Sequence, residues 1–341
     1  MNIQDHVTKT EIGIHTISLY AGNLKYHEIQ RAIDRQMEKR KIQVRKKDPY
    51  NIDRSLKDIY FLNEGITLWI YQSHDKSNGI SFVVNPSTLQ KGKYQPAKLW
   101  KPTKKACKSM ITGLNECINE LGLECTADDL SLSQMDLTMN LWLDDEADID
   151  EIIRLFQKCK FPRHFKRVHL KDKKADRHYF GIRTNDVLVK VYDKIFELQY
   201  NDRCLSKFAG KKLLRIEVSL KREAFLEKLS LKRGDDLYDM LEAGYRQAKS
   251  VIEGYLHKMF PCSGEFVSYK QAKKAIETGV KNQKLQEQML YLLKKTSRSA
   301  GLDTAVQMLR DHYKHVNHQR IKKLFAEFEE LGINPITLTK S

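Results

Sequence analysis

Three stretches in the second half of the chain decide the fold: SQMDLTMNLWL at 133–143, VLVKVYDK at 187–194 and LLRIEVSLKR at 213–222. In each stretch apolar and polar residues alternate, which indicates a β-strand with one face in a core and one polar face. Leu137 and Val191, for example, fall on apolar faces, whereas Asp136 and Tyr192 fall on polar ones.

The order of the elements around these strands predicts the fold class. Amphipathic helices are predicted at 148–159 and 195–200, with a short strand at 179–183. This β-α-β-β-α-β order is typical of the split βαβ arrangement, an antiparallel sheet with helices on one face. Strand-like and helix-like runs in residues 13–121 make the first half a candidate second copy. We therefore expect an α+β protein.

The last third of the chain reads as almost entirely helical, and residues 297–317 are a candidate helix-turn-helix. The change in character predicts three parts: an α+β DNA-binding half at 1–128, a catalytic-type α+β half at 129–225, and a helical region at 226–341.

The polar faces of the strands carry two acids and a tyrosine. In a split βαβ sheet the first strand lies between the third and the fourth. We therefore expect Asp136 to lie between Tyr192 and Glu217 on an uncovered face, with Arg183 extending that face. Two adjacent carboxylates repel each other unless positive charge separates them. Either a divalent cation or ion pairs with Lys190, Lys194 and Arg215 would supply that charge, and the sequence leaves both alternatives open.

Composition points to a polyanionic partner. Lysine and arginine number 60 against 44 acids in 341 residues, a formal net charge of +16. We expect no signal peptide, no membrane span and a cytoplasmic location in a bacterial host. The six cysteines form no CxxC pair, so we expect neither a zinc site nor a disulfide framework. Basic stretches at 35–47 and 98–108 suit phosphate contacts.

A tyrosine beside a metal and lysines is a candidate nucleophile for a phosphodiester. The metal would polarise the phosphate, the lysines would stabilise its charge, and a covalent phosphotyrosine would result. Packing within the sheet is the alternative explanation for Tyr192.

The ordered set SQMDLTMNLWLDD, RHYFGIRTNDVLVKVYDKIFE and LLRIEVSLKR resembles the rolling-circle replication initiators of filamentous phages and plasmids. Weaker similarities are GIHTISLY near the start, FVVNPSTL at 82–89 and ELGINPITL near the end. The sequence departs from the family pattern at Met135 and Lys190, where arginine is more usual. It also lacks the His-hydrophobic-His pair that many rolling-circle enzymes use for metal.

The resemblance implies an enzyme that binds a DNA origin, nicks one strand and rejoins it. It implies Tyr192 as nucleophile, with Tyr179 and Tyr200 as the alternatives, flanked by Lys190 and Lys194. Asp136 and Glu217 would hold Mg²⁺ or Mn²⁺. We expect DNA contacts from Arg183, Arg215, Lys104, Lys105, Arg40 and Arg45.

The partner implied by the resemblance is single-stranded or supercoiled origin DNA, together with a host helicase or polymerase. The alternative function is that of a non-catalytic origin-binding or copy-control protein. His312, His315 and His318 form a second candidate metal set, for which a solvated or DNA-facing helix surface is the competing explanation.

Overall fold

A computed structural model describes residues 2–22, 26–39, 43–44, 56–72, 78–203, 206–232, 235–298 and 301–339. The first half contains β1 (Val7–Gly22), α1 (Tyr26–Glu38), β2 (Gln43–Val44), β3 (Leu56–Asn63), β4 (Ile66–Gln72), β5 (Asn78–Val84), α2 (Pro86–Lys91) and α3 (Lys104–Leu121).

The second half repeats the alternation of strands and helices. It contains β6 (Ser131–Leu143), α4 (Ile149–Gln157), β7 (Lys166–Val168), α5 (Lys173–Arg177), β8 (Tyr179–Arg183), β9 (Val187–Asp193), α6 (Lys194–Tyr200), β10 (Lys212–Lys221) and α7 (Arg222–Lys228). The helical region that follows contains α8 (Leu237–Met259), α9 (Tyr269–Gly279), α10 (Gln283–Arg298), α11 (Leu302–His312) and α12 (His318–Glu330).

The described strands form one antiparallel sheet in the order β2-β3-β4-β5-β1-β6-β10-β9-β8-β7. The two halves have matching strand orders on either side of the central β1–β6 pair. Outward from the centre, the first half has the order β1-β5-β4-β3-β2 and the second half has the order β6-β10-β9-β8-β7. The expected α+β class with an antiparallel sheet is confirmed, and the sheet follows one topology twice.

The expected strand order within the second half is wrong. β6 does not lie between the third and fourth strands of its half, because β1 and β10 are its neighbours. β10 instead lies between β6 and β9, so Glu217 is on the middle strand of the three and Asp136 on an outer one. In a single split βαβ unit, the first strand would pair on both edges with strands of its own unit. Here one edge of β6 pairs with β1 of the other half, so only β10 of its own half can pair with it.

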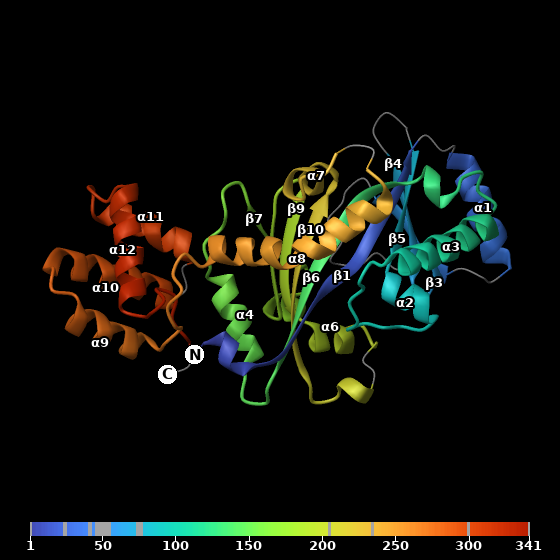
Figure 1. Cartoon of the computed structure of the whole chain (residues 1–341). Helices are drawn as coiled ribbons and strands as arrows, with labels where there is room; N and C mark the ends of the chain where they lie inside the picture. The colour runs from blue at the N-terminus through green and yellow to red at the C-terminus, as the bar shows by residue number, and fades with distance from the viewer. Residues whose placement is uncertain are drawn as a thin grey trace.

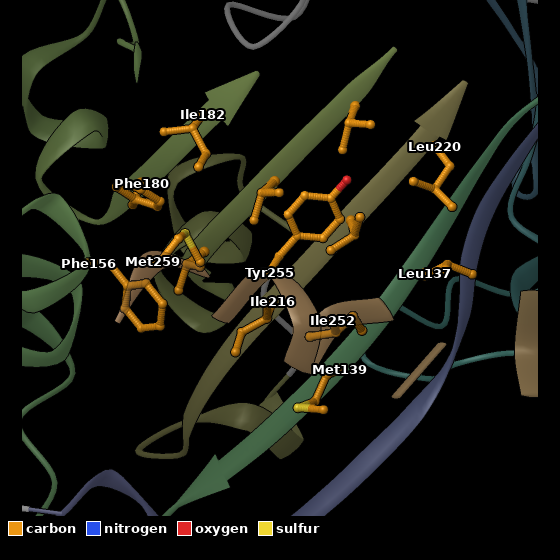
Figure 2. Close-up of a cluster of buried hydrophobic side chains, with 14 of the residues drawn as sticks. Leu137, Met139, Phe156, Phe180, Ile182, Ile216, Leu220, Ile252, Tyr255 and Met259 are labelled. Atoms are coloured by element: carbon orange, nitrogen blue, oxygen red, sulfur yellow. The ribbon is translucent and has the colours of Figure 1, made fainter. Parts of the chain in front are cut away.

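The apolar face of the sheet packs against helices as the alternation predicted. Met135, Leu137 and Met139 of β6 are buried, and the long helix α8 crosses above them. Figure 2 shows Ile252 of α8 near Met139 and Ile216 of the strands, and Met259 of α8 near Phe156 and Phe180. In Figure 1, α1 and α3 accompany the β3–β5 side of the sheet, and α9 to α12 gather beyond one end of α8. Burial of this apolar surface is the main stabilising contribution to the fold.

One glycine shows how closely a loop approaches the opposite face. A Cβ at Gly13 of β1 would lie 2.7 Å from the carbonyl oxygen of Trp100 and 2.8 Å from the Cβ of Leu99. The backbones of Ile14 and Trp100 exchange hydrogen bonds of 2.9 and 2.8 Å, which hold the loop in place. The close approach therefore requires a residue without a side chain.

We expect Gly13→Ala to lower the free energy of unfolding by about 1–3 kcal/mol, because the added methyl overpacks against backbone that is held by two hydrogen bonds. Urea denaturation measures the effect. Gly254→Ala in α8 is the matched control, since nothing lies within 4 Å of its added Cβ. That substitution should raise stability by about 0.5–1 kcal/mol through helix propensity. Equal stability of the Gly13 variant and the wild type would contradict the prediction and would show that the loop at Leu99 and Trp100 moves to make room for the methyl group.

Among the described residues, no helix is both long enough and apolar enough to cross a membrane.

Candidate active site

The polar face of the second half brings the predicted residues together. Asp136 of β6 pairs with Ser219 of β10, and Glu217 of β10 pairs with Lys190 of β9. Directly opposed residues point to the same face of an antiparallel sheet, and so do residues two apart on one strand. Asp136, Glu217, Lys190 and Tyr192 therefore share one face over three neighbouring strands.

A bulge in β1 adds His15, which was not among the residues predicted from the sequence. Ile14 pairs with Leu137 and Ile17 pairs with Met135, so His15 and Thr16 together oppose the single residue Asp136. Residues three apart in a regular strand face opposite sides of the sheet, but the bulge brings both Ile14 and Ile17 to the core face, where they are buried. The signal in the sequence is this break in alternation within GIHTISLY, but it does not reveal which strand lies alongside.

Glu217 is the centre of the cluster. Its side chain is 1% exposed and accepts a hydrogen bond of 2.9 Å from the Tyr192 hydroxyl. The Lys190 ammonium lies 2.5 Å from one carboxylate oxygen, and His15 Nδ1 lies 3.3 Å from the other. Burial alone would raise the pKa of Glu217, but the charge of Lys190, the hydrogen bond with His15 and the charge of Arg215 outweigh it and hold that pKa well below its usual range. Glu217 is thus a buried carboxylate that stays ionised.

Lys190 and His15 respond to the same surroundings in different ways. The burial of Lys190 opposes its charge, but Glu217 and Asp136 outweigh burial and raise its pKa, so the ammonium stays charged. Burial and the nearby Arg215 guanidinium lower the pKa of His15. At neutral pH His15 is therefore the uncharged imidazole, the form that binds metal ions.

The Tyr192 phenol is protonated in this state. Burial, followed by the negative charge of Glu217, raises its pKa well above the ordinary value for tyrosine. The hydroxyl oxygen is held in place by the bond to Glu217, while the ring remains half-buried. The arrangement positions a potential nucleophile but keeps it neutral in the absence of DNA.

The cluster has the composition of a metal site. Nitrogen and oxygen atoms of His15, Asp136 and Glu217 lie within 4.8 Å of one another. Asp136 is 7% exposed and accepts a hydrogen bond of 3.0 Å from Gln134. Carboxylates suit Mg²⁺ and Mn²⁺, and an imidazole nitrogen is more typical of transition metals, so the mixed set suits Mn²⁺. Glu217 also pairs with Lys190 at 2.5 Å and lies 3.8 Å from Arg215, whereas Lys194 pairs with Glu197. The same carboxylate therefore belongs both to the candidate metal site and to the ion pairs.

Arg215 lies inside the protein, and its burial argues against the predicted DNA contact. The side chain has no exposure, and its guanidinium donates to Asn140 at 2.8 Å and to the Pro96 carbonyl at 2.8 Å. One of its nitrogens is 3.8 Å from Glu217. Alternation correctly placed Arg215 on the polar face, but it did not show that a distant loop covers it.

The loop at Pro96 and Ala97 also corrects the prediction that the polar face of the sheet is uncovered. Asn140, which is fully buried, donates to the Ala97 carbonyl at 2.7 Å. Leu213 and Trp142 pack against Ala97 and α6 in a small apolar cluster. The loop around Pro96 and α6 therefore cover one end of the polar face, and the His15–Asp136–Glu217 cluster lies next to the covered end.

Lys194 lies at the start of α6 beside Tyr192. It is 4% exposed, and its ammonium is 2.6 Å from Glu197 and 6.0 Å from the centre of the Tyr192 ring. Burial lowers its pKa, partly offset by Glu197. A phosphate that approaches Tyr192 would therefore meet Lys190, which is 23% exposed, more readily than Lys194.

The alternative tyrosines pack beside Tyr192 in a small cluster with Val168 and Leu170. Tyr200 donates its hydroxyl to Asp172 at 2.9 Å, not to Glu217. Tyr179 pairs with Tyr192 across β8 and β9 and is 4% exposed, and burial raises its pKa to about 12.

The remaining predicted residues are dispersed. Arg183 is exposed and pairs with Leu188 on the same face as the cluster. Lys104 and Lys105 are exposed in the first turn of α3, with Lys104 5.9 Å from the Tyr238 ring of α8. Arg40 and Arg45 lie outside the described residues. In the C-terminal helices His312 stacks on Tyr291 at 4.6 Å, an aromatic contact rather than a metal cluster.

Comparison with known proteins adds only distant structural similarity. No family model and no curated protein matches the sequence. The chain is similar to the solved structure of the rolling circle replication initiator protein from Geobacillus stearothermophilus, with a TM-score of 0.35 and 8% sequence identity over 89% of this chain and 96% of that chain. Functional assignment of the present site therefore rests on its own geometry.

Proposed function

We propose that this protein is a DNA strand-nicking and rejoining enzyme that initiates rolling-circle replication of a phage or plasmid, with Tyr192 as its nucleophile. The observation that carries the proposal is the placement of the Tyr192 hydroxyl, 2.9 Å from a buried carboxylate that belongs to a His-Asp-Glu cluster and is paired with Lys190. The net charge of +16 supports nucleic acid as the substrate.

The chemistry requires one bond to form and one to break. The Tyr192 oxygen bonds to phosphorus, and the bond from phosphorus to the 3′ oxygen of the preceding nucleotide breaks. The departing 3′ oxygen takes up a proton, and the phenolic proton leaves toward Glu217 or water. The 5′ phosphate stays on the tyrosine, and the free 3′-hydroxyl is the end that a host DNA polymerase extends. Reversal of the same steps rejoins the strand without an external energy source.

Each neighbour of Tyr192 has a defined part. Glu217 orients the Tyr192 phenol through their hydrogen bond. Because the pKa of Glu217 is low, its carboxylate is a weak base for the phenolic proton. Lys190 offers a permanent positive charge to the phosphate oxygens. Arg215 would be a positioning residue, since it is buried and one of its nitrogens lies 3.8 Å from Glu217.

His15, Asp136 and Glu217 would hold a divalent cation, for which their mixed nitrogen and oxygen donors are suited. When bound, such a cation supplies electrophilic stabilisation to the scissile phosphate. Lys190 and the cation are both attracted to Glu217, so they would compete for this carboxylate.

The proposed function is tested by incubating the protein with supercoiled origin plasmid and with a labelled origin oligonucleotide, with Mn²⁺, Mg²⁺ or EDTA. We expect relaxed plasmid and a covalent protein–oligonucleotide adduct with metal, and neither with EDTA. An intact plasmid together with tight origin binding would instead support the non-catalytic origin-binding or copy-control alternative. A host helicase as partner is part of the proposal and is tested by unwinding assays on the nicked plasmid.

His15→Ala is expected to weaken Mn²⁺ binding at least about tenfold, because one of three converging donors is removed. Isothermal titration with MnCl₂ in the absence of DNA measures the affinity. His169→Ala is the matched control, since His169 is 69% exposed and lies outside the cluster. If both variants bind Mn²⁺ like the wild type, His15 is not a ligand.

A further inference from the structure

We propose that the polar face of the first half is a stacking platform for the bases of single-stranded DNA, formed by Tyr20, Trp69 and Tyr71. The proposal rests on the proposed function for DNA as the partner and adds the binding site for the unpaired strand. It is carried by the register of the sheet, by the placement of the three rings and by the charge of the surrounding face.

The register puts the three aromatic residues on the same face as the His-Asp-Glu cluster. Tyr20 of β1 pairs with Ser81 of β5, which in turn pairs with Trp69 of β4. Tyr71 lies two residues further along β4 and so shares that face. The face continues into the cluster through β1, because Ser18 pairs with Gln134, the residue that bonds Asp136. At about 3.3 Å per residue, Tyr20 lies roughly 15 Å from His15 along the strand.

The Tyr20 ring lies against the backbone of the sheet. A Cβ at Gly79 would be 2.3 Å from its hydroxyl, and a Cβ at Gly22 would be 3.3 Å from the ring. One side of the ring therefore covers glycine, and the residue remains 37% exposed. Gly79 pairs with Tyr71, so the Tyr20 ring lies beside the strand that carries the other two aromatic residues. The ring centres of Trp69 and Tyr71 are 6.4 Å apart, and both side chains are partly exposed.

The repeated topology sharpens the contrast between the two halves. Ile17 of β1 and Met135 of β6 pair with each other, and each follows a bulge in its own strand, so they are equivalent positions of the two halves. Three residues further along, Tyr20 pairs with Ser81 and Thr138 pairs with Glu217. Ser81 therefore corresponds to Glu217, and their partners Trp69 and Lys190 correspond to each other. The first half thus has the same face without the acid or the lysine. Where the second half has groups for chemistry on a phosphate, the first half has flat rings and glycine.

Single-stranded DNA fits this face better than duplex DNA does. Stacking requires exposed base faces, which a duplex hides, whereas an unpaired strand presents a base at every step. The backbone of such a strand needs cations along its path. Lys221 is exposed and pairs with Gln134, and Lys190 lies beyond it on the same face, so both flank the route from the rings to Tyr192.

The experiment measures affinity for oligo(dT) and for a duplex of equal length by fluorescence anisotropy, in EDTA so that no strand is cut. We expect Tyr20→Leu/Trp69→Leu to weaken oligo(dT) binding at least about tenfold and to reduce the preference for single strands over duplex. The slope of log affinity against log salt should not change, because no charge is removed. Oligo(dT) should also quench tryptophan fluorescence in the wild type and much less in Trp69→Leu.

Tyr245→Leu is the matched control, since Tyr245 is a partly exposed tyrosine of α8, on the opposite side of the sheet, and should leave both affinities unchanged. Equal oligo(dT) affinity of the double variant and the wild type would overturn the platform, as would an equal loss for both DNA forms. If the wild type fails to nick any plasmid while the double variant still loses oligo(dT) affinity, the platform stands and the proposed nicking activity fails.

Discussion

Tyr192→Phe is expected to reduce strand cleavage by roughly 10⁴-fold or more and to abolish the covalent DNA adduct, because the variant lacks the attacking oxygen. Affinity for the origin should be nearly unchanged, since the ring keeps its place beside Lys194 and in the cluster with Tyr179. Gel assays of nicking and of adduct formation, together with anisotropy for binding, separate the two properties.

Tyr179→Phe and Tyr200→Phe are the controls for this result. Both tyrosines pack beside Tyr192, and each variant removes a single hydroxyl from the same cluster. Neither should lose adduct formation if Tyr192 is the nucleophile. Digestion of the adduct and mass spectrometry should locate the nucleotide on the peptide that contains Tyr192. An adduct on Tyr179 or Tyr200 would assign the nucleophile to that residue instead.

Glu217→Gln is expected to lower the free energy of unfolding at pH 7 by about 3 kcal/mol, because it leaves Arg215 and Lys190 without their shared carboxylate. Arg215 has no exposure to solvent, so its charge has no compensation from water. Against a typical total stability of about 5–15 kcal/mol this is a large fraction. Urea denaturation of metal-free protein in EDTA gives the difference.

The same difference should shrink in acid. The folded pKa of Glu217 lies below its unfolded value of 4.5, so its ionisation contributes stability that is fully present above that pH. The contribution is lost as the pH falls through the lower folded pKa. The stability gap between the wild type and Glu217→Gln should therefore narrow as the pH falls below 4.5. A gap that stays constant into acid would show that Glu217 is not held ionised by its neighbours.

Glu242→Gln provides the matched control for stability. Glu242 pairs with Arg246 at 2.6 Å on the surface of α8, and the Arg246 side chain is 71% exposed. A surface pair of this kind contributes at most about 1 kcal/mol, so the control should differ little from the wild type at any pH. Comparable losses for both variants would show that burial of the Glu217 pair is unimportant.

Local sequence pattern was enough to predict β6, β8, β9 and β10 and the face of each residue in them, but it missed the short strand β7. Alternation with a period of two is a local property, so it is enough to assign Asp136, Tyr192 and Glu217 to one polar face. Composition likewise indicated a polyanionic partner. The chemistry of Tyr192 came from the resemblance to replication initiators, because packing alone would also explain a tyrosine in a strand.

Which strands are neighbours could not be read from the local pattern and followed from the tertiary structure. β1 and β6 are more than a hundred residues apart in sequence, yet their pairing moves Glu217 to the middle strand and brings His15 opposite Asp136. Likewise, the loop at Pro96 buries Arg215 from a distant part of the chain. Alternation assigns a side chain to a face, but it contains no information about the strand or loop that lies against that face. The positions of Glu217, His15 and Arg215 in the site therefore depend on contacts between residues far apart in the sequence.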